Sequence, residues 1–179
     1  MIMTRELTTE EKIVAALRRI IRAVDLHSKY LTHRYGLTGP QIVILQEVLR
    51  SRSISTGDLA ENVNLSQATV SDILDRLEKR DLVKRTRSSA DKRRVLNEVT
   101  AKAEEILKEA PPLLQDRFVH SLSQLNDWEQ THILSTLQRV ARMMQAEEIE
   151  AAPVLVSGPL AVSAREAAEF FSKEEGAKD

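Results

Sequence analysis

The chain has 179 residues, 42% of them hydrophobic and 30% charged, so one domain of ordinary size can bury its own core. Its formal net charge of −1 excludes a uniformly basic coat for nucleic acid or membrane, although a local basic patch stays open. The absence of cysteine excludes a disulfide framework, a thiolate metal site and a cysteine nucleophile.

Two helices with capping boxes are predicted at the start of the chain. The box Thr8–Glu11 begins a long helix that ends at Gly36, and the box Thr38–Gln41 begins a second helix that ends near Ser51. The apolar stripe of the first helix comprises Ile13, Leu17, Ile20, Ile21, Val24 and Leu31.

A helix-turn-helix pattern follows. Ser55 is placed to cap a short helix, residues 62–65 form a turn, and Ser66 caps the next helix. The apolar residues of that second helix fall on one face and leave the opposite face polar; they are Val70, Ile73, Leu74 and Leu77. Short, partly β-branched runs at Leu82–Thr86 and Val95–Thr100 then predict a two-stranded hairpin with a charged tip between Arg87 and Arg94.

Two more helices and a tail complete the predicted elements. Thr100 begins a fifth helix that Pro111-Pro112 should bend or break near Ala110, and Asn126 begins a sixth that frays near Ile149. The tail from residue 151 is partly disordered in this interpretation. We expect its apolar residues to pack onto the helical part; they are Leu155, Leu160, Phe170 and Phe171.

Positive charge is concentrated on the helix-turn-helix and hairpin. Residues 76–94 contain nine basic and three acidic residues, a net charge of +6, which leaves −7 for the other 160 residues. A charged hairpin alone is more often a solvated loop, but beside a helix-turn-helix the asymmetry favours contact with phosphates.

In order and spacing, several motifs resemble the MarR family of winged-helix transcription regulators. They are Asp58-Leu59-Ala60, Ser66-Gln67-Ala68-Thr69-Val70-Ser71, Arg76-Leu77-Glu78-Lys79-Arg80, Leu82-Val83-Lys84-Arg85, Asp91-Lys92-Arg93 and Val99-Thr100. The resemblance implies a mainly α fold of about six helices with a two-stranded β wing and a C-terminal extension. It divides the chain into a dimerisation domain (1–35 and 101–150), a winged helix-turn-helix domain (36–100) and an extension (151–179).

The resemblance and the groove-sized polar face together predict the DNA contacts. The recognition helix would present small polar side chains to a major groove, with Arg76 reaching base or phosphate. By the family's pattern Arg93 enters the minor groove, Asp91 orients it, and Lys92 and Arg94 follow phosphates. The full predicted set is Gln67, Ala68, Thr69, Ser71, Asp72, Arg76, Arg87, Asp91, Lys92, Arg93 and Arg94. The simpler alternative is that Thr69 and Ser71 only favour the helix start and that Asp91 only forms a turn.

The sequence departs from the family in three places. Asp81 stands where a glycine usually follows the recognition helix, Ala103 replaces a glycine in the fifth helix, and the tail has no counterpart in a minimal member. A left-handed Asp81 can still end the helix at some cost.

The sequence offers candidates for an effector site and no pattern typical of a metal or catalytic site. Family members often bind a small molecule between the helical domain and the DNA-binding lobe, and the candidates here are His27, Tyr30, His33 and Arg34. The alternative that these are ordinary polar residues of the inter-lobe surface is the stronger one. The four histidines lack metal-ligand spacing, and neither a phosphate loop nor a nucleophile elbow occurs, so we expect neither a metal, a cofactor nor catalysis.

The sequence therefore predicts a cytoplasmic regulator that binds a pseudo-palindromic operator in double-stranded DNA as a homodimer and acts as a repressor. An effector of unknown identity would release it, and no membrane contact is expected, since neither a secretory signal nor an apolar run of eighteen residues occurs. Similarity of the tail to that of MarR-type regulators of osmolyte genes would imply control of such genes. The alternative is a winged-helix protein-interaction or scaffold module without sequence-specific DNA binding.

Overall fold

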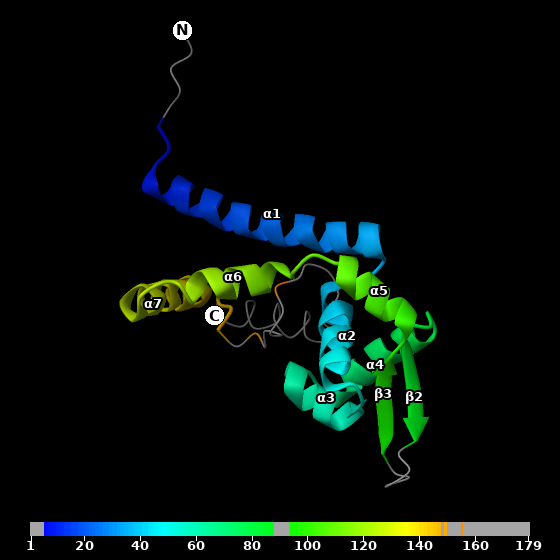
Figure 1. The fold of residues 1–179 in the computed structure, drawn as a ribbon. Helices are drawn as coiled ribbons and strands as arrows, with labels where there is room; N and C mark the ends of the chain where they lie inside the picture. Colours follow the sequence, from blue (N-terminus) through cyan, green and yellow to red (C-terminus); the bar gives the residue numbers. More distant parts are fainter. Residues whose placement is uncertain (1–5, 88–93, 148, 150–154, 156–179) are drawn as a thin grey trace, which may run out of the picture.

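The computed structural model describes residues 6–87, 94–147, 149 and 155, and within them the fold is mainly helical (Figure 1). The helices are α1 (Thr9–Tyr35), α2 (Gly39–Ser51), α3 (Thr56–Val63), α4 (Gln67–Glu78), α5 (Ala101–Glu109), α6 (Leu114–Leu122) and α7 (Asp127–Met143). The strands are β1 (Ile54–Ser55), β2 (Val83–Arg87) and β3 (Val95–Val99). In Figure 1, α1, α6 and α7 lie at one end and the strands β2 and β3 project from the other.

Helices α1 and α2 begin at the predicted capping boxes. The Thr8 amide donates to the Glu11 carboxylate at 2.8 Å, and the Thr38 amide donates to Gln41 Oε1 at 3.0 Å. Gly36 ends α1 in the left-handed region, with φ of 64°. A side chain has little room there, because a Cβ added to Gly36 would lie 3.0 Å from Arg80 Nη2.

The sheet has one strand more than the sequence predicted. The order is β1-β3-β2, all antiparallel, and β3 pairs with β2 from Val83↔Val99 to Arg87↔Val95. The third strand, β1, contributes only the pairs Ile54↔Asn97 and Ser55↔Leu96. The predicted two-stranded wing is present as β2 and β3. Strand β1 was not predicted, because a two-residue strand leaves too short a pattern to detect.

The double proline breaks the predicted fifth helix into two, so the described chain has seven helices where about six were predicted. Helix α5 ends at Glu109 and α6 starts at Leu114. Pro111 and Pro112 have no amide hydrogen to donate to the preceding turn, which explains the interruption. Helix α7, the last helix within the described residues, ends at Met143, six residues before the predicted fraying point at Ile149.

The core lies in the lobe that α2, α3, α4 and the sheet build, with Leu31 of α1 and Ala103 of α5 packed against it. Helix α1 buries only Ser28 and Leu31, and every described residue of α6 and α7 stays at least partly exposed. The apolar stripe of α1 and the large apolar side chains of α6 and α7 therefore remain largely uncovered in the single chain.

The tail lies mostly outside the described residues, and this includes Leu160, Phe170 and Phe171. Leu155 is 43% exposed, so its side chain does not show the predicted packing, although its backbone amide donates to Gln115 Oε1 of α6 at 3.2 Å. None of the described helices is long and apolar enough to cross a membrane.

Candidate nucleic-acid interface

Helix α4 presents a polar face opposite its buried one. The Ser66 hydroxyl accepts from the Thr69 amide at 3.1 Å and caps the helix as predicted. The core takes Val70, Ile73, Leu74 and Leu77, so the side chains on the other side are turned to solvent. The predicted DNA-contacting residues of this helix are exposed at Gln67, Ala68, Asp72 and Arg76 and partly exposed at Thr69 and Ser71.

Arg85 of β2 holds the wing against α4. Its Nη2 donates to Asp75 Oδ1 at 2.6 Å and to the Ser71 carbonyl at 3.4 Å, and its Nε lies 3.5 Å from Glu78 Oε2. In the sequence this arginine belongs to the basic run and to the Leu82-Val83-Lys84-Arg85 motif, and no partner was predicted for it. Asp75 and Glu78, three residues apart and thus on one face of α4, were the signal that could have identified its partners.

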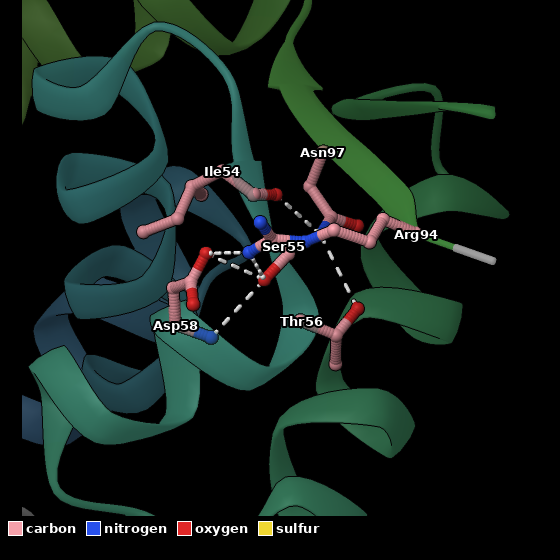
Figure 2. A network of polar contacts seen from close by, with 6 residues as sticks. All are labelled: Ile54, Ser55, Thr56, Asp58, Arg94 and Asn97. Atoms are coloured by element: carbon pink, nitrogen blue, oxygen red, sulfur yellow. Dashed lines mark hydrogen bonds and ion pairs between the residues drawn. The ribbon is translucent and has the colours of Figure 1, made fainter. Parts of the chain in front are cut away.

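The wing places its two described tip residues differently. Arg87 ends β2 and is exposed, whereas Arg94, just before β3, turns back to the start of α3 and donates to Ser55 and Asp58 (Figure 2). Asp91, Lys92 and Arg93 lie outside the described residues.

The end of α4 is joined to both α1 and α5. Arg80 Nη1 donates to the Gly36 carbonyl at 2.5 Å, and Lys102 Nζ donates to the Arg80 carbonyl at 2.9 Å. Asp81 adopts the left-handed conformation expected of it, with φ of 59°, and its carbonyl accepts from the Thr100 hydroxyl. These bonds connect the end of α4 to the end of α1 and to the start of α5.

The basic run therefore serves two purposes. Arg80, Arg85 and Arg94 donate to groups of the chain itself. The other basic residues of this run that the structure describes are all exposed, and no ion pair is recorded for them within residues 6–87 and 94–147; they are Arg76, Lys79, Lys84 and Arg87. This second group is available to phosphates.

The four effector candidates have different surroundings in the single chain. His27 Nε2 accepts from the Leu114 amide at 3.2 Å and caps α6; burial, and then the nearby Arg117, lower the pKa of His27. Tyr30 packs edge-on against Tyr35, with ring centroids 6.1 Å apart, while His33 and Arg34 are exposed in the last turn of α1.

None of these four residues lines the hollow that the structure describes on α1. This open hollow of about 500 Å³ is lined by other side chains, namely Arg18, Arg19, Arg22, Ala23 and Leu26. Within the described ranges no cluster of three or more His, Asp or Glu side chains could hold a metal ion.

Comparison with known proteins identifies the family. The MarR family profile matches residues 37–95. The HTH-type transcriptional regulator MgrA of Staphylococcus aureus is 31% identical over 108 residues, which are 60% of this chain and 74% of that protein.

Solved structures agree on the fold. The S. aureus MepR–DNA complex superposes with a TM-score of 0.53 at 18% identity, covering 77% of this chain and 99% of that one. A mutant MarR from E. coli in complex with operator DNA gives a TM-score of 0.51 at 22% identity, covering 76% and 99%. The chain belongs to the MarR family of winged-helix, DNA-binding transcriptional regulators.

Proposed function

We propose that the chain is a homodimeric repressor that binds a pseudo-palindromic operator in duplex DNA. The observation that carries the proposal is the exposed polar face of α4 next to a wing with exposed cations, at the end of the molecule opposite the uncovered apolar helices. Occupation of promoter DNA by such a dimer excludes other proteins from it, and repression is the consequence.

In this proposal α4 and the wing contact different parts of the duplex. Small polar side chains near the start of α4 fit a major groove, so Gln67, Ala68, Thr69, Ser71 and Asp72 meet base edges or the adjoining backbone. Arg76, two turns on from Ala68, reaches base or phosphate. From the family resemblance, Arg93 enters the flanking minor groove with Asp91 orienting it, and Lys92 follows a phosphate. Arg87, exposed at the end of β2, contacts another phosphate.

The exposed apolar side chains support a dimer. Those on α1, α6 and α7 are too numerous for a monomer in water; they include Ile13 (51% exposed), Ile20 (55%), Ile21 (64%), Val119 (57%), Trp128 (70%), Leu134 (56%) and Met143 (77%). A two-fold axis lets one copy cover the stripes of the other and sets two recognition helices one helical turn of DNA apart. Residues 1–35 and 101–150 then form the dimerisation domain and residues 36–100 the DNA-binding domain.

An effector would act at the C-terminal end of α1. Tyr30, His33 and Arg34 are exposed there, close to the point where the Tyr35 hydroxyl donates to the Glu109 carbonyl of α5 at 2.9 Å. A small anion bound by Arg34 and His33 would alter this joint and release the DNA. His27 already accepts from the Leu114 amide at the start of α6 and is left out of this effector site. Control of osmolyte genes was inferred from tail residues that lie almost entirely outside the described ones, and we assign no regulon.

The test starts from a duplex selected by the purified full chain from a random-sequence pool. We expect binding of the selected duplex in preference to random DNA, a log affinity that falls steeply with log salt, and repression of transcription in vitro from a promoter containing the selected duplex. Sedimentation should give twice the mass of one chain. If the chain shows neither salt-dependent nor sequence-dependent binding to duplex DNA, a protein-interaction module is the better description.

A further inference from the structure

Arg94 stands where the wing tip joins the body of the lobe. The last pair of the wing ladder is Arg87↔Val95, so Arg94 is the first residue of the tip on the β3 side. Figure 2 shows its side chain reaching back to the start of α3, where Nη2 donates to Ser55 Oγ at 3.1 Å and to Asp58 Oδ2. Its cationic group is thus already bound to an anionic one.

The site that receives Arg94 is organised without it. Ser55 is the N-cap of α3: its Oγ accepts from the Asp58 amide at 3.2 Å and donates to Asp58 Oδ2 at 2.7 Å. The bond from Arg94 fills the second acceptor position of that hydroxyl. Asp58 lies in the first turn of α3, where the helix dipole favours a carboxylate.

This pre-organisation sets the pair apart from most surface ion pairs. About half of each side chain is exposed, 51% for Arg94 and 54% for Asp58. Exposed pairs are usually weak because two long side chains must be ordered to form them. Here the short acidic partner is held in place by the cap, so only the arginine has to be ordered.

A separate contact fixes the base of the same strand. Asn97 is fully buried, and its Nδ2 donates to the Ile54 carbonyl at 2.9 Å and to Thr56 Oγ1 at 3.3 Å (Figure 2). Arg94 lies three residues farther toward the tip, about 10 Å along an extended chain. The pairing of β1 with β3 ends at Ser55↔Leu96, so without Arg94 only β2 would hold β3 beyond Leu96.

From this geometry we infer that Arg94 and Asp58 are positioning residues that set the direction of the wing on the DNA, and that Arg94 is not a phosphate contact. The inference rests on the proposed function, because a wing direction has an effect on affinity only if the wing meets the duplex. It implies that Asp58, an acid outside the predicted set of DNA contacts, increases the affinity of the chain for DNA, although DNA is a polyanion.

The sign of the Asp58 effect separates this role from simple electrostatics. Asp58→Asn and Arg94→Gln change the net charge in opposite directions, by +1 and −1. If charge alone mattered, the first would tighten binding and the second would weaken it. If the pair positions the wing, both weaken binding.

The experiment measures the affinity of the full chain for the selected duplex at several salt concentrations, using Arg94→Gln, Asp58→Asn and the double variant. We expect each single variant to bind about two- to fivefold more weakly, with the double variant no weaker than Arg94→Gln and the salt slope unchanged. The control is Glu61→Gln, an exposed acid on the same helix with no ion pair recorded for it among the described residues, which should bind at least as tightly as wild type. Thermal melting confirms that each variant is folded, and Asp58→Glu, which keeps the charge but moves it, replaces Asp58→Asn if that variant does not fold.

Hydroxyl-radical footprinting gives a positional readout that a loss of stability would not produce. In both single variants, protection of the outer minor grooves should fade while protection of the major groove by α4 stays. The inference is overturned if Asp58→Asn binds as tightly as wild type while Arg94→Gln lowers the salt slope by about one unit, since Arg94 then contacts a phosphate. It is equally overturned if neither variant changes affinity or footprint. If wild type itself leaves the outer minor grooves unprotected, the proposed wing contact fails and not merely the role of this pair.

Discussion

Replacement of Ile20 by alanine tests whether a second copy covers α1. Ile20 lies in the middle of the α1 stripe and is 55% exposed in the single chain, so the protomer's own packing depends little on it. Complete burial of an isoleucine stabilises by about 1.5–3 kcal/mol. Covering the exposed 55% would contribute about 1–1.5 kcal/mol.

The symmetry of a dimer doubles this contribution. A two-fold axis buries the same residue in both copies, which gives up to about 2–3 kcal/mol and a dimer dissociation constant about 30- to 150-fold higher in the variant. Sedimentation with a fluorescently labelled tracer measures that constant from nanomolar to micromolar concentration. Arg18→Ala is the matched control, because Arg18 is exposed two residues earlier and so lies on the far side of the helix.

Two results would refute this reasoning. A wild-type chain that is a folded monomer at micromolar concentration would mean that the stripes of α1, α6 and α7 are not an interface between copies. A dimer that Ile20→Ala and Arg18→Ala leave equally strong would place the interface elsewhere.

Three further predictions concern the DNA-binding face and two titrating groups. Gln67→Ala should reduce discrimination between selected and random duplex by about 1–3 kcal/mol at constant salt slope, whereas Arg93→Ala should lower that slope by about one unit; the same pattern for both would contradict the division between helix and wing. The hydrogen bond from Arg50 lowers the pKa of Glu47 from 4.5. Glu47→Gln should therefore lose about 1–2 kcal/mol of unfolding free energy at pH 7. This difference should disappear as the pH falls below 4.5 and through the folded-state pKa of Glu47. Burial lowers the pKa of His27 from 6.5, so the stability of the wild-type chain should decline as the pH falls from 6.5 toward the folded-state pKa. His27→Leu should remove this decline in urea titrations. An unchanged pH profile in the variant would argue against the hydrogen bond from the Leu114 amide to His27.

Local features of the fold could be predicted because each depends on a few neighbouring residues. The caps at Thr8, Ser55 and Ser66 and the left-handed Asp81 follow from short-range hydrogen bonding and backbone preference. Strand β1 could not be predicted, because its two residues are held by pairing with β3 some forty positions later. The proline pair predicted an interruption but left open whether the helix bends or breaks, since this depends on what caps α6.

The roles of individual residues in the candidate site were harder to predict than the local features of the fold. The sequence identifies the basic run but does not show which of its arginines contact phosphate and which bind acidic residues of the lobe, because both kinds are the same amino acid. The division depends on acids distant in sequence: Asp75 lies 10 residues from Arg85, and Asp58 lies 36 residues from Arg94. Residues on the outer face of α4 were easier to assign, since helical periodicity alone places them opposite the core.

The acidic residues of the lobe therefore influence DNA binding as much as its basic residues do. Asp58, Asp75 and Glu78 neutralise the arginines that fix the wing and the recognition helix, which lowers the charge of the patch and holds its shape. Removing one of these acids makes the lobe more positive and at the same time loosens it. Charge and geometry then act on affinity in opposite directions, so net charge alone cannot rank variants of this lobe, and the sign of the change in affinity reports which of the two dominates at each position.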